Sequence, residues 1–229
     1  MTQTRGLEVW LGEWLLYLNT MFSNLSAFEI VALLVSLVIS LAIHEAMHGF
    51  VAHWLGDDTA QQAGRLTLNP LKHIDLLTTI ILPAVMILTV GQPFLAAKPV
   101  PFNPERLKYG EFGVALVGIA GPVTNFLLAV IGAIAFHAAG LHASADVYNA
   151  IVIFVEINIA MFVFNMIPFP PLDGSRLLYA FAPEALQDVM RQIESAGFLA
   201  ILVFILLIFQ FIAGPIENIE THLLTFLLG

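Results

Sequence analysis

The sequence predicts an all-α polytopic membrane protein with about four to six transmembrane helices. Its composition is the first reason, because the 229 residues are 59% hydrophobic and only 11% charged, whereas soluble domains carry about 25% charged residues. The mean hydropathy of +0.89 is the second. The third is that the apolar residues gather into segments long enough to cross a bilayer.

The segments follow one another within a single domain, residues 1–229. Residues 7–22 place tryptophans, leucines and two glutamates at helical spacing, so they form either an interfacial helix or a short span. Residues 27–54 are the first clear span. A polar connector at 58–75 follows, in which GRLTL (64–68) has strand character. Further helices are expected at 112–139, at 147–167 with a Pro-rich turn to 174, at 175–194 as an amphipathic stretch, and at 196–213 before an interfacial tail.

Cysteine is absent, which excludes disulfides and thiolate metal ligands and leaves His, Asp and Glu for any metal site. The net charge is −9, but the acidic residues are dispersed along the chain. No nucleic-acid surface is therefore indicated.

The motif HEAMH lies inside the apolar segment 27–54, where ionisable residues are costly and indicate a functional site. His44 and His48 are four residues apart, so on a helix they project from one face and can bind one zinc ion. Glu45 is adjacent to the first histidine and can reach a water on that ion without being a ligand. This spacing predicts two zinc ligands and a general base.

A catalytic zinc site needs a third protein ligand and an open position for water. Asp173 is the best candidate, because it follows a Pro-rich break in NMIPFPPLDG. Irregular backbone at membrane depth is tolerated only where it lines a cavity or packs against protein. The alternative is that Asp173 is simply a turn residue at the exit of a helix.

Three further residues are candidates for supporting roles. Asn125 lies in AGPVTN and can hydrogen-bond a substrate backbone or a tetrahedral oxyanion. The alternative for Asn125 is a hydrogen bond between helices. His73, in LNPLKHID, and Asn165, which opens NMIPFPPLDG, are secondary candidates.

HEAMH, GPVTN and NMIPFPPLDG, in this order on hydrophobic segments, resemble the site-2 protease family of intramembrane metalloproteases. The connector AGRLTLNPLKHID followed by KPVPFNP is similar to the compact prokaryotic branch that lacks PDZ and CBS domains. The resemblance covers about residues 36 to 180. One departure is FLAAKPVP, where a Gly-Trp pair before the lysine would be expected.

The resemblance implies a zinc-dependent intramembrane endopeptidase with one Zn²⁺ per chain, held by His44, His48 and Asp173. It also implies that Glu45 is the general base and that Asn125 contacts substrate or the oxyanion. The region after HExxH would form a membrane-associated β-hairpin that receives an unwound substrate as an added strand. The implied substrates are single-pass or small membrane proteins within the lipid bilayer.

Two alternatives stay open beside the protease. A zinc transporter can also carry an HExxH-like helix, although no His-rich loop is present here. A zinc-binding pseudoprotease acting as an adaptor is the other, and the presence of Glu45 argues against it.

The metal site also constrains the topology. HEAMH and Asp173 both lie toward the C-terminal ends of their helices, so those ends must face one side of the membrane. A full crossing by 76–95 would separate them, so we expect this segment, with its two prolines and Gly91, to be re-entrant or broken. Most Lys and Arg residues then share one side, which the positive-inside rule makes cytoplasmic. This predicts a multi-pass protein of the cell membrane with its active site nearer the cytoplasm.

Overall fold

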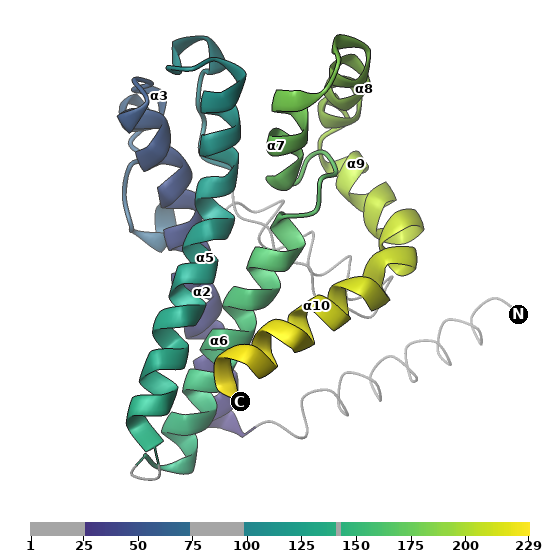
Figure 1. Ribbon diagram of the computed structural model, residues 1–229. Helices are drawn as coiled ribbons and strands as arrows, with labels where there is room; N and C mark the ends of the chain where they lie inside the picture. Colours follow the sequence, from purple (N-terminus) through teal and green to yellow (C-terminus); the bar gives the residue numbers. More distant parts are fainter. Residues whose placement is uncertain (1–25, 74–98, 141–142) are drawn as a thin grey trace, which may run out of the picture.

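The computed structural model describes residues 26–73, 99–140 and 143–229, and these ranges are mostly helical (Figure 1). Three long helices dominate them: α2 (Ala27–Trp54), α5 (Glu111–Ala139) and α6 (Ala145–Asn165). Within the described ranges these three are long and apolar enough to cross a membrane. The chain is therefore a helical, multi-pass membrane protein, as the composition predicts. The interfacial helix or short span expected at 7–22 and the re-entrant or broken segment expected at 76–95 lie outside the described ranges.

Helix α2 begins at a capping box, in which Ser26 and Glu29 each accept a hydrogen bond from the other's backbone N–H. It has the bounds expected from the sequence. Its buried residues include a stripe at every fourth position: Ser36, Ser40, His44, His48 and Ala52. Residues four apart share one face of a helix. This face meets α5 and α6, since both pack against α2.

Helix α5 packs against both α2 and α6, and its buried face carries small residues. These are Gly113, Ala115, Gly118, Ala120, Gly121, Ala129, Gly132 and Ala133. Small residues let membrane helices approach closely. The expected GPVTN helix therefore brings its backbone close to both α2 and α6.

The connector after α2 contains two short helices, α3 (Thr59–Gln62) and the 3-10 turn η1 (Pro70–Lys72). The strand expected at 64–68 is not found, and no strand occurs in 58–73, the described part of the expected hairpin. Gly64 ends the first turn with a φ of +64°, and the Asn69 side chain caps the second by accepting from Leu71 N–H. A strand needs a partner, and no partner strand lies beside residues 65–68 in the described part of the chain.

The connector before α5 contains the 3-10 turn η3 (Pro104–Arg106), and it lies against the connector after α2. Lys108 N–H donates to the Leu55 carbonyl at 2.9 Å, and Asn103 N–H donates to the Asp57 carboxylate at 2.6 Å. The connectors after α2 and before α5 therefore lie side by side.

Beyond α6, a Pro-rich turn leads to α7 (Gly174–Phe181) and α8 (Glu184–Ser195). The chain then continues as α9 (Phe198–Val203), a π-helical segment η5 (Phe204–Phe209) and α10 (Gln210–Leu228). In the described part of the chain, a fourth span arises only if α8 and residues 199–209 count as one helix despite a bend of 101°. Within the span expected at 196–213, the structure has α9, η5 and the start of α10.

The C-terminal tail, which the sequence predicts to be interfacial, forms most of α10 in the structure. Helix α10 runs back across α6 (Figure 1), and its Ile216 and Leu227 are buried against α5 and α6. The His137 ring lies 2.8 Å from the Leu227 carbonyl. These apolar side chains thus pack α10 against the long helices.

Candidate metal centre and active site

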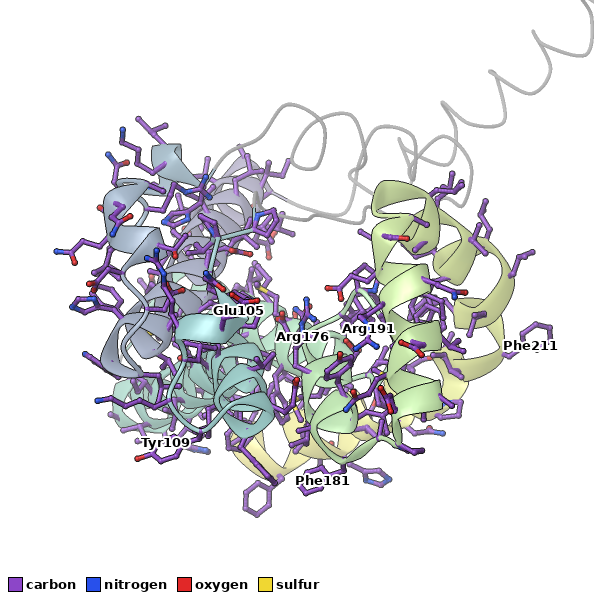
Figure 2. The ribbon with its side chains drawn as sticks, turned by 90° about the horizontal axis from the view of Figure 1, so that it is seen from above. Glu105, Tyr109, Arg176, Phe181, Arg191 and Phe211 are labelled. Carbon is purple, nitrogen blue, oxygen red and sulfur yellow. The ribbon has the colours of Figure 1, made fainter. Side chains whose placement is uncertain are left out.

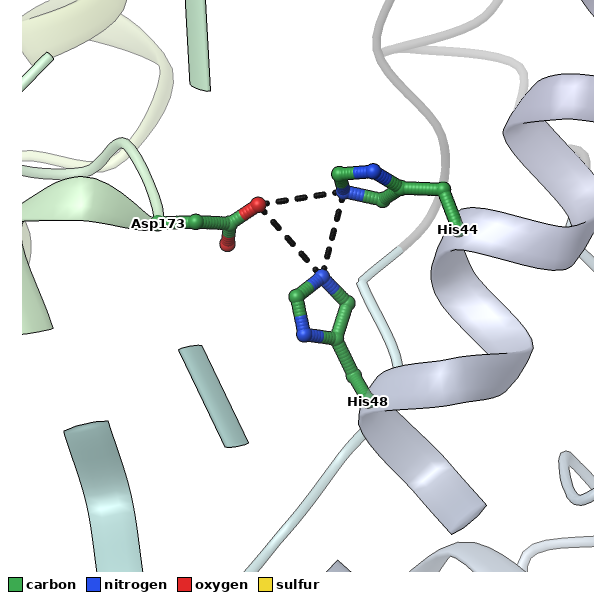
Figure 3. Close-up of side chains that lie close together, drawn as sticks. All are labelled: His44, His48 and Asp173. Carbon is green, nitrogen blue, oxygen red and sulfur yellow. Dashed lines mark hydrogen bonds and ion pairs between the residues drawn. The ribbon is translucent and has the colours of Figure 1, made fainter. Parts of the chain in front are cut away.

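Two histidines of α2 and one carboxylate from the start of α7 converge at a single point (Figure 3). His44 Nε2 lies 3.0 Å from Asp173 Oδ2, and His48 Nε2 lies 3.4 Å from the same oxygen. The two Nε2 atoms are 3.1 Å apart. Ligand atoms of a tetrahedral zinc ion, each bound at 2.0–2.1 Å, lie about 3.3 Å from one another. The three atoms therefore have the spacing of zinc ligands.

Gly121 of α5 provides the space between these atoms. A Cβ placed on it would lie 2.5 Å from His48 Nε2 and 2.6 Å from His44 Nε2. No side chain larger than hydrogen fits there, and a zinc ion at 2.0–2.1 Å from each nitrogen would use this space. The space at Gly121 is therefore a second observation, independent of the ligand distances, that fits a zinc ion at this point.

The second nitrogen of each imidazole has a hydrogen-bond acceptor. His44 Nδ1 lies 2.5 Å from Asn125 Oδ1, and His48 Nδ1 lies 2.7 Å from the Val117 carbonyl. A backbone carbonyl can only accept, so the proton of His48 is on Nδ1. Protons on Nδ1 leave both Nε2 lone pairs for a metal, which is how histidine ligands are usually oriented.

Asp173 reaches this point because the turn after α6 is compact. Met166–Leu172 fold back on the end of α6, and a Cβ on Gly174 would lie 2.4 Å from the Met166 carbonyl. The turn places Asp173 Oδ2 opposite the Nε2 atoms of both histidines. An ionised carboxylate is what a metal ligand requires.

Glu45 lies beside the three ligands and is held by backbone from the connector before α5. Its Oε2 accepts a hydrogen bond from Val100 N–H at 3.1 Å. Glu45, His48 and Asp173 line one cavity of about 290 Å³. The carboxylate therefore faces the same space as the ligands, which suits a proton-transfer group.

Two further charged residues line this cavity beside apolar ones. Arg176 of α7 and Glu194 of α8 both line it, and they are joined by two hydrogen bonds, one of 3.0 Å. Figure 2 shows Arg176 near the centre of the molecule, between α5 and α8. A bidentate Arg–carboxylate pair fixes the relative position of two elements. The pair therefore connects α7, which bears Asp173 at its start, to α8.

The supporting candidates are placed differently from one another. Asn125 is fully buried, and its Nδ2 donates to Asn158 Oδ1 at 2.9 Å while its oxygen faces His44. The Asn125–Asn158 hydrogen bond joins α5 to α6, and such an interhelical bond is the alternative that the sequence offered to an oxyanion role for Asn125. His73 is buried with its Nε2 2.8 Å from the Thr67 carbonyl, and Asn165 donates to the Met161 carbonyl of its own helix at 3.0 Å. Neither joins the metal cluster found among the described residues.

Sequence reasoning missed three contributors to this site: Gly121, Val100 and the Arg176–Glu194 pair. Gly121 lies four residues before Asn125 in AGPVTN, so the small-residue run was a usable signal of close approach. Val100 and Glu194 act through a backbone N–H and a long-range contact, for which a single sequence carries no signal.

Comparison with known proteins identifies a peptidase family and relatives named as zinc metalloproteases. The model of peptidase family M50 matches residues 132–213, which include Asp173. The Bacillus subtilis (strain 168) protein named "Putative zinc metalloprotease YwhC" is 38% identical over 194 residues, or 81% of this chain and 85% of that protein. "Putative zinc metalloprotease Rip2" of Mycolicibacterium smegmatis is 28% identical over 164 residues, or 72% of this chain and 62% of that protein. No solved structure gives a significant match. By the extent of its similarity to YwhC, the chain belongs to peptidase family M50.

Proposed function

We propose that this protein is a zinc-dependent intramembrane endopeptidase in which His44, His48 and Asp173 hold one zinc ion and Glu45 is the general base. The observation that carries the proposal is the convergence of the two Nε2 atoms and one carboxylate oxygen around the space left by Gly121. Membership of family M50 and the names of its relatives support the same chemistry.

Zinc bound at such a site polarises a carbonyl and makes water acidic enough to lose a proton near neutral pH. Glu45 is placed to take that proton, since its carboxylate faces the cavity with His48 and Asp173. It then gives the proton to the amine that leaves when the peptide bond breaks. The Val100 N–H holds the carboxylate in one position for both transfers.

The site lies on the buried faces of membrane-spanning helices, which supports membrane-protein substrates. A transmembrane helix keeps its carbonyls in internal hydrogen bonds, so a substrate has to unwind before a scissile carbonyl is reachable. Pro99, Val100 and Phe102 line the cavity beside the charged Arg176. This mixture suits an extended apolar segment that enters from a polar side.

The active site is proposed to face the cytoplasm. The C-terminal end of α2, both connectors and α7 lie toward one end of the long helices (Figure 1). The Lys and Arg residues of the described chain lie in the connectors after α2 and before α5 and in α7 and α8: Arg65, Lys72, Arg106, Lys108, Arg176 and Arg191. Such an excess of positive charge is typical of the cytoplasmic side of a cell membrane.

The transporter and adaptor alternatives are not favoured by the comparisons. The described residues also contain a single group of metal-ligating side chains, whereas transport needs a route of successive sites. Zinc flux into proteoliposomes is the measurement that would favour a transporter.

The proposal is tested by comparing membrane-protein fragments, by mass spectrometry, in cells that produce wild-type protein or Glu45→Gln. Glu45→Gln should abolish cleavage and retain zinc, because Gln cannot transfer the proton and Glu45 is not a ligand. Glu105→Gln, at an exposed residue of η3, is the matched control and should cleave normally. Normal cleavage by Glu45→Gln would refute the assignment of the general base.

A further inference from the structure

A chain of buried polar side chains connects the proposed metal centre to the interior of the helix bundle. Asn125 of α5 contacts His44, Asn158 of α6 contacts Asn125, and Ser40 of α2 contacts Asn158. The distances are 2.5, 2.9 and 2.8 Å. All three supporting side chains are fully buried. Buried amides among apolar helices are costly unless each group is paired.

The Phe154 carbonyl determines which group donates and which accepts in each of these hydrogen bonds. Asn158 Nδ2 lies 2.8 Å from the Phe154 carbonyl and 2.8 Å from Ser40 Oγ. A carbonyl cannot donate, so the NH₂ group of Asn158 has to face Phe154, and its oxygen has to face Asn125. The opposite orientation would leave the Phe154 carbonyl facing an oxygen.

The orientation of Asn158 determines the orientation of Asn125 and, through it, which nitrogen of His44 carries the proton. Because Asn158 presents an oxygen, Asn125 turns its NH₂ toward it and its own oxygen toward His44. The His44 proton is then held on Nδ1, and Nε2 is left with a lone pair toward Asp173 and His48. An interhelical bond that served packing alone would not need to end on a ligand in this orientation.

We propose that Asn158 and Ser40 are positioning residues for the metal, acting through Asn125 to fix the tautomer and ring orientation of His44. The inference rests on the proposed zinc site. Loss of an outer partner of a metal-bound histidine typically lowers metal affinity about tenfold to one-hundredfold.

The experiment measures zinc dissociation constants of purified protein by chelator competition. Asn158→Ser is the variant of choice, since a serine in a membrane helix bonds the carbonyl four residues before it, here that of Phe154, but cannot reach Asn125. We expect zinc affinity to fall about tenfold or more. Ser40→Ala should cause a smaller loss, because Asn158 keeps its bond to Phe154.

Asn149→Leu is the matched control. Asn149 also lies on α6 and hydrogen-bonds α2, through Glu29 at 2.8 Å, but it is exposed and separate from the chain of amides. The Asn149→Leu variant should bind zinc with the same affinity as the wild type. Melting of the zinc-free proteins verifies that each variant is folded before metal is added.

A double-mutant cycle separates positioning from packing. In the background of Asn125→Ser, adding Asn158→Ser should cause no further loss of affinity, because the connection to His44 is already broken. Equal zinc affinity of wild type and Asn158→Ser, or fully additive losses, would overturn the inference. Failure of the wild type itself to bind zinc would overturn the proposed function instead.

Discussion

At the scale of single residues, the metal centre depends as much on an absent side chain as on its ligands. Gly121 leaves room between two imidazoles that a methyl group would fill at 2.5–2.6 Å from both Nε2 atoms. Backbone of α5 cannot retreat easily, because α5 packs against α2, α6 and α7.

Gly121→Ala should therefore remove most of the bound zinc while the helices stay formed. Zinc content and circular dichroism are the two readouts. Gly132→Ala is the control on the same helix, since its added Cβ would meet the Val155 side chain at 2.7 Å rather than a ligand. Retention of stoichiometric zinc by Gly121→Ala would show that the ion does not occupy this space.

A second residue-scale feature is Asp57, which is fully buried and anchors the connector that holds Glu45. It accepts hydrogen bonds from Thr59 N–H at 3.1 Å, the Thr59 hydroxyl at 2.5 Å and Asn103 N–H at 2.6 Å. Burial raises its pKa, but these hydrogen bonds outweigh burial and lower the pKa below its ordinary value.

Asp57→Asn should lower stability by about 1–3 kcal/mol near neutral pH. A lowered native pKa means that Asp57 contributes stability above about pH 3.9, its ordinary pKa, and loses it as the pH falls toward the native value. The melting difference between wild type and variant should thus shrink below about pH 4. Asp58→Asn, at a more exposed neighbour, is the control. A difference that is constant with pH would contradict this account of Asp57.

At the scale of elements, the sequence predicted the helices whose apolar pattern is long and uninterrupted. The bounds expected for 27–54 are those of α2, and 112–139 differs from α5 by one residue at its start. His44, Glu45 and His48 were found because i, i+4 spacing on one helix is visible in the chain itself.

Elements that depend on distant partners were not predicted. The residues at 64–68 are typical of a strand, but in the structure they connect turns at Gly64 and Asn69 and form no strand. The packing of α10 against α5 and α6 was not visible in the sequence, because its partners lie far away along the chain. Asn125 had two plausible partners in sequence, and only the placement of His44 and Asn158 distinguishes them.

At the scale of the whole molecule, the topology places the connectors after α2 and before α5 at one end. Hydrogen bonds from Lys108 to Leu55 and from Asn103 to Asp57 join them directly. The end of α5 and the start of α6 lie at the opposite end of these helices (Figure 1).

This topology predicts the labelling of single cysteines, for which the cysteine-free chain is a natural background. Gln62→Cys and Glu105→Cys, both at exposed positions, should react with an impermeant thiol reagent from the cytoplasmic side. Asp146→Cys, exposed at the start of α6, should react from the other side. Labelling of residues 62 and 105 from opposite faces would contradict the arrangement.

The central claim is that one zinc ion is held by His44, His48 and Asp173, with Glu45 beside it. Metal analysis of purified wild type, Asp173→Ala and Glu45→Gln tests it most directly. We predict one zinc per chain in the wild type and in Glu45→Gln, and loss of most zinc in Asp173→Ala, because Asp173 is a ligand and Glu45 is not. Full zinc content in Asp173→Ala, or none in the wild type, would contradict the claim.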